Sequence, residues 1–187
     1  MGNDSSNVAV ANPYTDGCGY IGTADSKVPT DAISAIPPDF ENLGYFSEEG
    51  VVESEPIESS EIKAYGGDVV HTTETRGGHT VKFKCIETNP TVLKARYGEE
   101  NVQIDLESGA FKVSHNGKRI PVLPYIFEFA LSETLIKRTV VPRGKVTGTE
   151  DLTHDGKNPL GYGFTITALP YDDEGNTSQD YFAEVVK

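Results

Sequence analysis

The chain contains no tryptophan, one methionine and two cysteines among its 187 residues. The two thiols, Cys18 and Cys85, are too few for a disulfide framework or a four-cysteine zinc site. A single Cys18–Cys85 disulfide stays open, and a reduced, intracellular chain is the simpler interpretation. Hydrophobic residues make up only 36% of the sequence. No window approaches the roughly 18 apolar residues of a membrane span, and the first residues do not resemble a secretory signal. The sequence therefore predicts no membrane insertion.

Basic side chains are also scarce. The chain has 16 Lys and Arg residues against 29 Asp and Glu residues, which gives a formal net charge of −13. Tight wrapping by nucleic acid needs clustered Lys and Arg to neutralise phosphates. The balance argues against that class of protein and favours a chain that repels its own copies at low salt.

Alternating apolar and polar residues dominate the sequence after residue 39. A period of two is typical of a strand with one buried face and one wet face, and it indicates a mainly β fold. The Asn116-Gly117 pair predicts a hairpin turn, because both residues tolerate a positive φ. The alternating segments are residues 80–87, 102–107, 111–115, 125–131 and 164–168.

One helix interrupts the strand pattern, at about residues 90–97. Asn89 is a good N-cap, Pro90 suits the first helical position, and Gly98 is a typical C-terminal stop. Val92 and Leu93 give the helix a narrow apolar stripe, so we expect it to pack on the sheet.

The chain divides into a poorly patterned start and a single domain. Residues 1–38 are rich in Asn, Ser, Asp, Gly and Pro and predict a flexible N-terminal arm. Residues 39–187 predict one β-rich domain. Within it, residues 47–79 form a long, acidic, glycine-punctuated excursion, which predicts an extended loop with a functional role.

Motifs that carry chemistry are weak or absent. Gly17-Cys18-Gly19-Tyr20-Ile21-Gly22 fits a dinucleotide fingerprint by letter, but no buried strand is predicted before it and no helix after it. The four histidines show no metal-ligand spacing, and residues 172–176 lack the register of a calcium loop. No residue stands in a nucleophile elbow. We expect no enzyme activity, no cofactor and no metal.

The order of features is more specific than any motif. An L-G-Y-x-S-E-x-G segment at residues 43–50 precedes an A-x-G-G-D-V-V segment at residues 64–70, and the capped helix and later strands follow. This order resembles the major tail tube protein of long, non-contractile-tailed phages, particularly those that infect actinobacteria. The resemblance covers most of residues 39–187.

The resemblance implies a β-sandwich or barrel of the tail tube type, with one packed helix and a long loop or arm. It also implies rings of six copies, stacked into a tube through which DNA leaves the capsid without specific binding. The chain itself would be the main partner, and tape measure, tail-tip and tail terminator proteins would be further ones. The location would be the virion tail, after assembly in the host cytoplasm.

Two sets of residues follow as candidates for function. Acidic residues on solvent faces of the predicted strands would line the channel and repel DNA, and the excursion would reach an adjacent subunit or ring. The candidate lumen acids are Asp105, Glu107 and Glu128. The candidate arm residues are Ser47, Glu48, Glu49, Val51, Val52, Ile57, Tyr65 and Arg76.

Two alternatives remain beside the tube subunit. A monomeric β-sandwich binding module of a virion or surface protein would share the strand pattern, although the lack of tryptophan disfavours sugar binding. An enzyme of an unfamiliar β fold would need a pocket in which polar groups converge.

Overall fold

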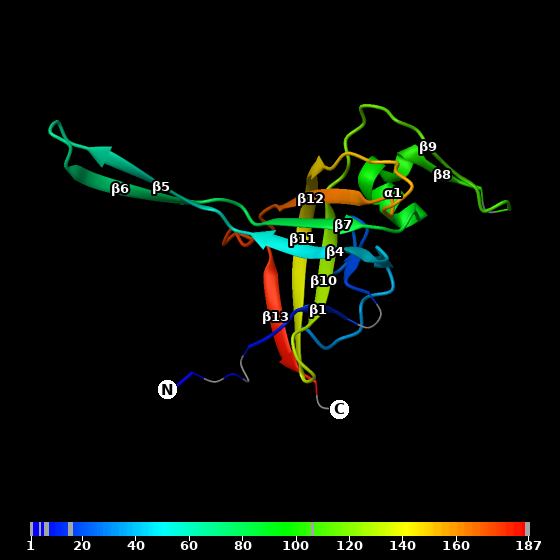
Figure 1. The fold of residues 1–187 in the computed structure, drawn as a ribbon, viewed down its shortest axis with the longest axis horizontal. Coiled ribbons are helices and arrows are strands. Elements are labelled where there is room, and N and C mark those ends of the chain that lie inside the picture. Colours follow the sequence, from blue (N-terminus) through cyan, green and yellow to red (C-terminus); the bar gives the residue numbers. More distant parts are fainter. Residues whose placement is uncertain (1, 4, 6–7, 15–16, 106, 186–187) are drawn as a thin grey trace.

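The chain folds around one antiparallel sheet that bends into two crossing layers (Figure 1). The computed structural model describes residues 2–3, 5, 8–14, 17–105 and 107–185, without the side chain of Arg76. Within these residues the sheet has nine strands. They are β1 (Asn12–Pro13), β2 (Gly19–Ile21), β3 (Glu41–Asn42), β4 (Phe46–Ser54), β7 (Thr80–Cys85), β10 (Leu123–Ala130), β11 (Leu135–Thr149), β12 (Tyr162–Ala168) and β13 (Gln179–Glu184).

Strand β11 belongs to both layers. Its first half pairs with β13 and β10, and its second half pairs with β12. The first layer therefore runs β3-β2-β10-β11-β13, and the second runs β11-β12-β7-β4. The main core includes buried side chains of both layers, among them Phe83, Phe127 and Phe164. The ring centroids of Phe83 and Phe164 are 5.1 Å apart. The prediction of a mainly β fold is confirmed.

Gly144 lies where β11 passes from one layer to the other. A Cβ atom at this position would be 2.5 Å from Cδ2 of Tyr125 and 2.9 Å from Cγ2 of Ile166. Tyr125 and Ile166 are both fully buried. Only glycine leaves room for this close approach of the two layers.

We expect Gly144→Ala to lower the free energy of unfolding by about 1–3 kcal/mol, because an added methyl group overpacks the core. Urea denaturation followed by circular dichroism would measure the change. Gly156→Ala is the matched control, because a Cβ there meets nothing within 4 Å. Equal stabilities of the two variants would show that the layers can move apart at Gly144 without cost.

Helix α1 (Pro90–Tyr97) forms where the sequence predicts it. The side chain of Asn89 accepts a hydrogen bond from the Val92 amide at 2.9 Å, and the Gly98 amide donates to the Lys94 carbonyl at 2.8 Å. Val92 and Leu93 are buried in the main core. A short 3-10 helix, η2 (Glu99–Asn101), follows directly. The predicted helix, including both caps, is confirmed.

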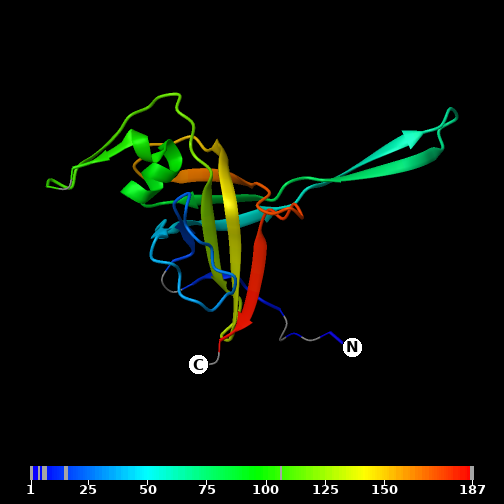
Figure 2. The ribbon, with the colours of Figure 1, turned by 180° about the vertical axis from the view of Figure 1, so that it is seen from behind.

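Two hairpins project from the sheet. One consists of β5 (Ile57–Lys63) and β6 (Val69–Arg76), and the other of β8 (Val102–Ile104) and β9 (Phe111–Val113). They lie at opposite ends of the molecule in both views (Figures 1 and 2).

The turn predicted at Asn116-Gly117 does not join two strands. Residues 114–122, all of them described, form no strand. Asn116 instead donates from Nδ2 to Oδ1 of Asn101 at 2.6 Å and accepts from the Lys118 amide at 2.9 Å. Its side chain ties this loop to η2, and the turn that joins β8 to β9 lies at Asp105–Ala110, where the Asp105 amide donates to the Ala110 carbonyl at 2.7 Å.

The stretch predicted to be flexible through residue 38 is in part an inner piece of the sheet. Strand β2 pairs with β10 on one side and β3 on the other, and Cys18, Tyr20 and Ile21 are buried. Gly19 lacks the Cβ that would collide with the ring of Phe46. The glycines of the fingerprint-like motif thus serve close packing, and three residues are too few to show a strand period in sequence.

Candidate assembly surfaces

The hairpin of β5 and β6, which we call the arm (residues 57–76), extends the β4–β7 pair away from the body of the protein (Figure 1). At its root the Gly77 amide donates to the Pro56 carbonyl at 2.7 Å. At its tip the Ala64 amide donates to the Asp68 carbonyl at 2.7 Å, and Gly66 and Gly67 have positive φ. The excursion predicted as a loop is therefore an ordered β-hairpin.

The arm exposes apolar side chains that no other part of the described chain covers. Tyr65 stands at the tip with its full surface exposed, and Ile57, Ile62 and Val70 are 57–62% exposed. Every residue of β5 is exposed. A two-stranded hairpin without a core is marginally stable alone in water. Exposed apolar side chains on such a hairpin favour burial against another molecule.

Some of the residues predicted to form an arm lie in the β5–β6 hairpin, and others lie in the sheet. Ile57 and Tyr65 lie in the arm, and the side chain of Arg76 falls outside the described part of the structure. Val51 packs against the main core, and Val52 is exposed on β4. Ser47, Glu48 and Glu49 lie in an irregular stretch of β4, where the pairing with β7 jumps from Phe46–Cys85 to Val51–Phe83. The projecting hairpin begins at Ile57, about ten residues after the start of the predicted excursion.

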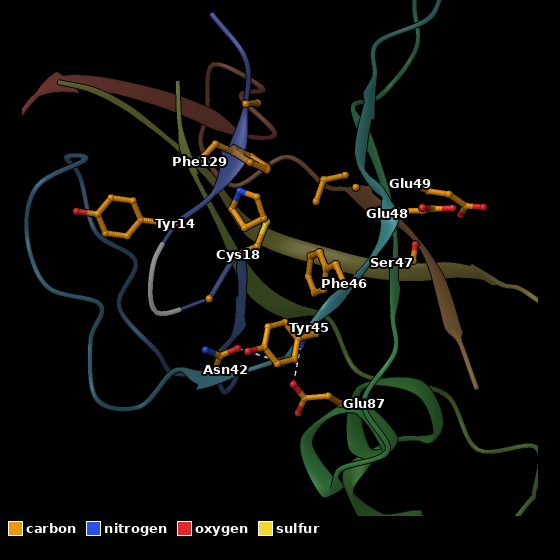
Figure 3. Close-up of a pocket in the computed structure, with 16 residues that line it drawn as sticks. Tyr14, Cys18, Asn42, Tyr45, Phe46, Ser47, Glu48, Glu49, Glu87 and Phe129 are labelled. Carbon is orange, nitrogen blue, oxygen red and sulfur yellow. Dashed lines mark hydrogen bonds between the residues drawn. The ribbon is translucent and has the colours of Figure 1, made fainter. Parts of the chain in front are cut away.

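This irregular stretch of β4 borders a groove of about 610 Å³. Figure 3 shows Cys18, Phe46 and Phe129 around its middle, with Glu48 and Glu49 on the far side of β4. Below them the Tyr45 amide donates to the Glu87 carboxylate at 2.8 Å. None of the described residues that line the groove is His, Lys or Arg. The groove therefore offers the Cys18 thiol no neighbouring cation that would stabilise a thiolate.

The thiol in this groove is held in its neutral form. Burial, with a smaller contribution from the Glu128 carboxylate, raises the pKa of Cys18 to about 12. Burial, followed by the effects of Glu87 and Cys18, also raises the pKa of Cys85 far above its usual range. Both cysteines are free and buried. Neither has the exposed, electropositive surroundings of a reactive thiol.

We expect both thiols to react with iodoacetamide at pH 8 at least about a hundredfold more slowly in the folded chain than in urea, because a raised pKa leaves almost no thiolate. Mass spectrometry of timed samples would measure the rates. Fast labelling of Cys18 in the folded chain would mean that β2 opens readily.

The three candidate lumen acids do not share a surface. Asp105 and Glu107 are exposed at the turn of the β8–β9 hairpin. There Asp105 accepts hydrogen bonds from the Ser108 hydroxyl and from the Glu107 and Ser108 amides, which lower its pKa. Glu128 was expected on a solvent face, and this is wrong: its residue is 7% exposed.

Glu128 is buried because it pairs with Arg138 on the neighbouring strand. Its Oε1 accepts from Nε and Nη2 of Arg138 at 2.7 and 2.6 Å. Arg138 also donates to the carbonyls of Asp31 and Ser34 at 2.7 and 2.6 Å. These bonds fasten residues 22–40, which we call the covering segment, over the outer face of the first layer. Phe40, Val28 and Ile36 of this segment pack there with Tyr20 and Ile126.

The histidines of the described residues lie apart from other groups that could bind a metal ion. In the described part of the chain, no group of three or more His, Cys, Asp or Glu side chains is placed to hold a metal ion. His79 is buried and shares a hydrogen bond with the Ser178 hydroxyl at 2.5 Å. Asp172 accepts from the Asn176 side chain at 2.7 Å and closes its own turn. No helix within the described residues is long and apolar enough to cross a membrane.

Comparison with known proteins gives one family. A family model described as "Phage tail tube protein" matches residues 1–181. The match includes the first 38 residues as well as the β-rich part. No curated protein matches the sequence.

Among solved structures, the chain is similar to one described as a cryo-EM structure of the anti-feeding prophage cap, a tube terminating cap. The sequences are 8% identical and the TM-score is 0.45. The match covers 98% of this chain and 100% of the other.

Proposed function

Because the chain belongs to the phage tail tube protein family, we propose that its copies form rings of six, which stack into the tube of a phage tail and provide the conduit for DNA ejection. The family makes the chain a structural protein of the virion tail. The ring symmetry and the passage of DNA are part of the proposal. So are the absence of catalysis and of any cofactor.

The arm is the observation that supports self-assembly most directly. It exposes Ile57, Ile62, Tyr65 and Val70 on a hairpin with no core of its own. Burial of apolar surface contributes about 25 cal/mol per Å², so contact with an adjacent subunit or ring would stabilise both the arm and the assembly. We propose that the arm makes this contact.

The shape of the chain suits head-to-tail association. The arm and the β8–β9 hairpin lie at opposite ends of the molecule (Figures 1 and 2), so a contact between them on two copies uses two different surfaces. Heterologous contacts of this kind close into rings or extend into filaments. Strand β4 ends the order of strands in the sheet, and an open edge favours pairing with another chain.

Other partners follow from a place in the tail. We propose contacts with the tape measure, tail-tip and tail terminator proteins, and assembly in the host cytoplasm. DNA would pass through the tube without base-specific contacts.

Negative-stain electron microscopy of the concentrated protein across a salt series tests the proposal. We expect rings or hollow tubes that become more abundant as salt screens the charge of −13 on each copy. A tail-tip seed should be added if the protein alone stays monomeric, because polymerisation can need an initiator. Monomers that persist with the seed would overturn the proposal and favour a monomeric binding module.

A further inference from the structure

Three strands bring a lysine and two carboxyl groups together where the two layers meet. Lys137 lies on β11, Asp180 on the neighbouring strand β13, and Glu53 on β4 of the second layer. The Lys137 ammonium contacts the Glu53 carboxylate at 2.7 Å and the Asp180 carboxylate at 3.0 Å. The Lys137 side chain is only 16% exposed. An amine is thus held against two carboxyl groups with little access to water.

A buried hydroxyl joins the same two carboxyl groups. The Thr139 hydroxyl lies 2.8 Å from Oε1 of Glu53 and 2.6 Å from Oδ1 of Asp180, and Thr139 is fully buried. A hydroxyl has one hydrogen to donate. Both contacts are therefore full hydrogen bonds only when one carboxyl group carries a proton and donates it to the hydroxyl. In that arrangement one of the two groups is a neutral acid, which is the form of a carboxyl group that an amine can attack.

Lys84 also contacts two acids, but in different surroundings. Its ammonium lies 3.2 Å from Glu49 and 2.9 Å from Glu150, whose side chains are 66% and 57% exposed. The side chains of Glu53 and Asp180 are 25% and 41% exposed. Water surrounds the acids of Lys84, so this group is an ordinary surface ion pair.

We propose that the folded chain joins Lys137 to Asp180 by an intramolecular isopeptide bond. The Nζ atom of Lys137 attacks Cγ of Asp180, so that the Nζ–Cγ bond forms and the bond from Cγ to Oδ2 breaks. One ammonium hydrogen stays on the amide nitrogen, and the other two leave with Oδ2 as water. Glu53 accepts a proton from the ammonium and returns it to the departing oxygen. The step needs no oxidant, reductant or cofactor, and it goes beyond the proposed function because it requires only the folded chain.

Proximity favours this reaction, and the ion pair makes it slow. Fixed geometry can raise the effective concentration of two reacting groups to as much as about 10⁵–10⁸ M. Burial lowers the pKa of Lys137, but its hydrogen bonds with Glu53 and Asp180 outweigh burial and raise that pKa above its usual value. The ammonium is therefore the resting form, and each attack waits until a proton passes to Glu53. We expect the bond to form over hours to days.

The bond would fasten the last strand of the described chain. Strand β13 pairs with β11 and with no other described strand, so it could peel from one edge of the sheet. A covalent link between β11 and β13 prevents this. It also closes a loop of the chain and so restricts the unfolded state, as a disulfide does.

The intact mass of the full chain, measured under denaturing conditions, tests the bond directly. After several days of storage at neutral pH, we expect the chain to be lighter than its sequence by one water molecule. Peptide mapping should find one branched product that joins Lys137 to Asp180. Lys137→Arg keeps a cation but lacks the attacking amine, so it should keep its full mass. Water lost elsewhere, for instance at Asp155-Gly156, would also be lost by Lys137→Arg.

Further variants test the role of each group. Asp180→Asn should lose ammonia in place of water and reach the same final mass as the native chain. Glu53→Gln should form the bond at least about a hundredfold more slowly, because it cannot carry the proton. Lys84→Arg is the matched control for a lysine between two acids and should still lose one water. A branch from Lys137 to Glu53 would overturn the assignment of these two acids.

Stability provides a second measurement on the same samples. The unfolding midpoint of the native chain should rise by about 10 °C as the water is lost, whereas that of Lys137→Arg should stay constant during storage. A native chain that keeps its full mass after storage, both as monomers and after concentration for assembly, would overturn the inference. A chain that loses the water but forms no tubes would support the bond while the proposed function fails.

Discussion

Replacing Arg138 by Met should lower the free energy of unfolding by about 3–5 kcal/mol, the largest loss we expect from one substitution, because it leaves a buried carboxylate without its partner. Glu128 forms an ion pair with Arg138, and the Arg138 side chain is 4% exposed. The variant also loses the bonds to the carbonyls of Asp31 and Ser34. Urea denaturation would give the change in free energy.

A double variant separates the charge from the packing. Glu128→Leu with Arg138→Met removes both charges, and replacement of a buried pair by apolar residues is often close to neutral. It should recover most of the loss, while trypsin should still cut at Lys27 faster than in the native chain, since the covering segment remains unfastened. Lys63→Met, which removes an exposed pair with Glu61 at 3.6 Å, is the control and should cost less than about 1 kcal/mol. A loss below that value in Arg138→Met would contradict the prediction.

Removing the arm should abolish polymerisation and leave the body folded. The cut should replace residues 57–76 by a short Asn-Gly turn, because Pro56 and Gly77 are already joined by a backbone hydrogen bond of 2.7 Å. The arm contributes no side chain to either buried core cluster, so its loss should leave the unfolding midpoint almost unchanged. Circular dichroism would measure the midpoint and electron microscopy the tubes.

Two point variants refine the arm experiment. Tyr65→Ser removes the exposed ring at the tip and should weaken assembly, whereas Ser60→Ala alters an exposed polar position of β5 and should not. Tubes of normal length from the shortened chain would refute the role of the arm. A shortened chain that fails to fold would show instead that the arm supports the sheet.

Local signals predicted the fold best. Helix α1 was predictable because Asn89, Pro90 and Gly98 act on their own neighbours in sequence. The strands around Phe83, Phe127 and Phe164 were predictable because their alternation is long.

Features that depend on distant partners were not predictable. Strand β2 is three residues long and pairs with β10 and β3, which lie far from it or outside any local period in sequence. Asn116-Gly117 does not join two strands, because the Asn116 side chain donates a hydrogen bond to the side chain of Asn101 instead.

The candidate site likewise combines a local feature that could be predicted with distant contacts that could not. Ile126 alternates with Tyr125 and Phe127, so the outer face of β10 was apolar at that point, and this was the one sign that something covers Glu128. The burial of Glu128 also depends on its pairing with Arg138 and on the covering segment, and no spacing in the sequence links Arg138 to that segment.

The position of β12 in the sheet determines when the nascent chain can complete the second layer. β12 follows β7 by more than 70 residues yet lies directly beside it, and β2 has to wait for β10 in the same way. Contacts so distant in sequence form late, and a ribosome delivers the chain at about 5–20 residues per second. The arm therefore emerges early, while the second layer that carries it is finished only after residue 168 has left the exit tunnel. Under the proposed function, a chain released before that point would carry the arm without the finished layer that supports it.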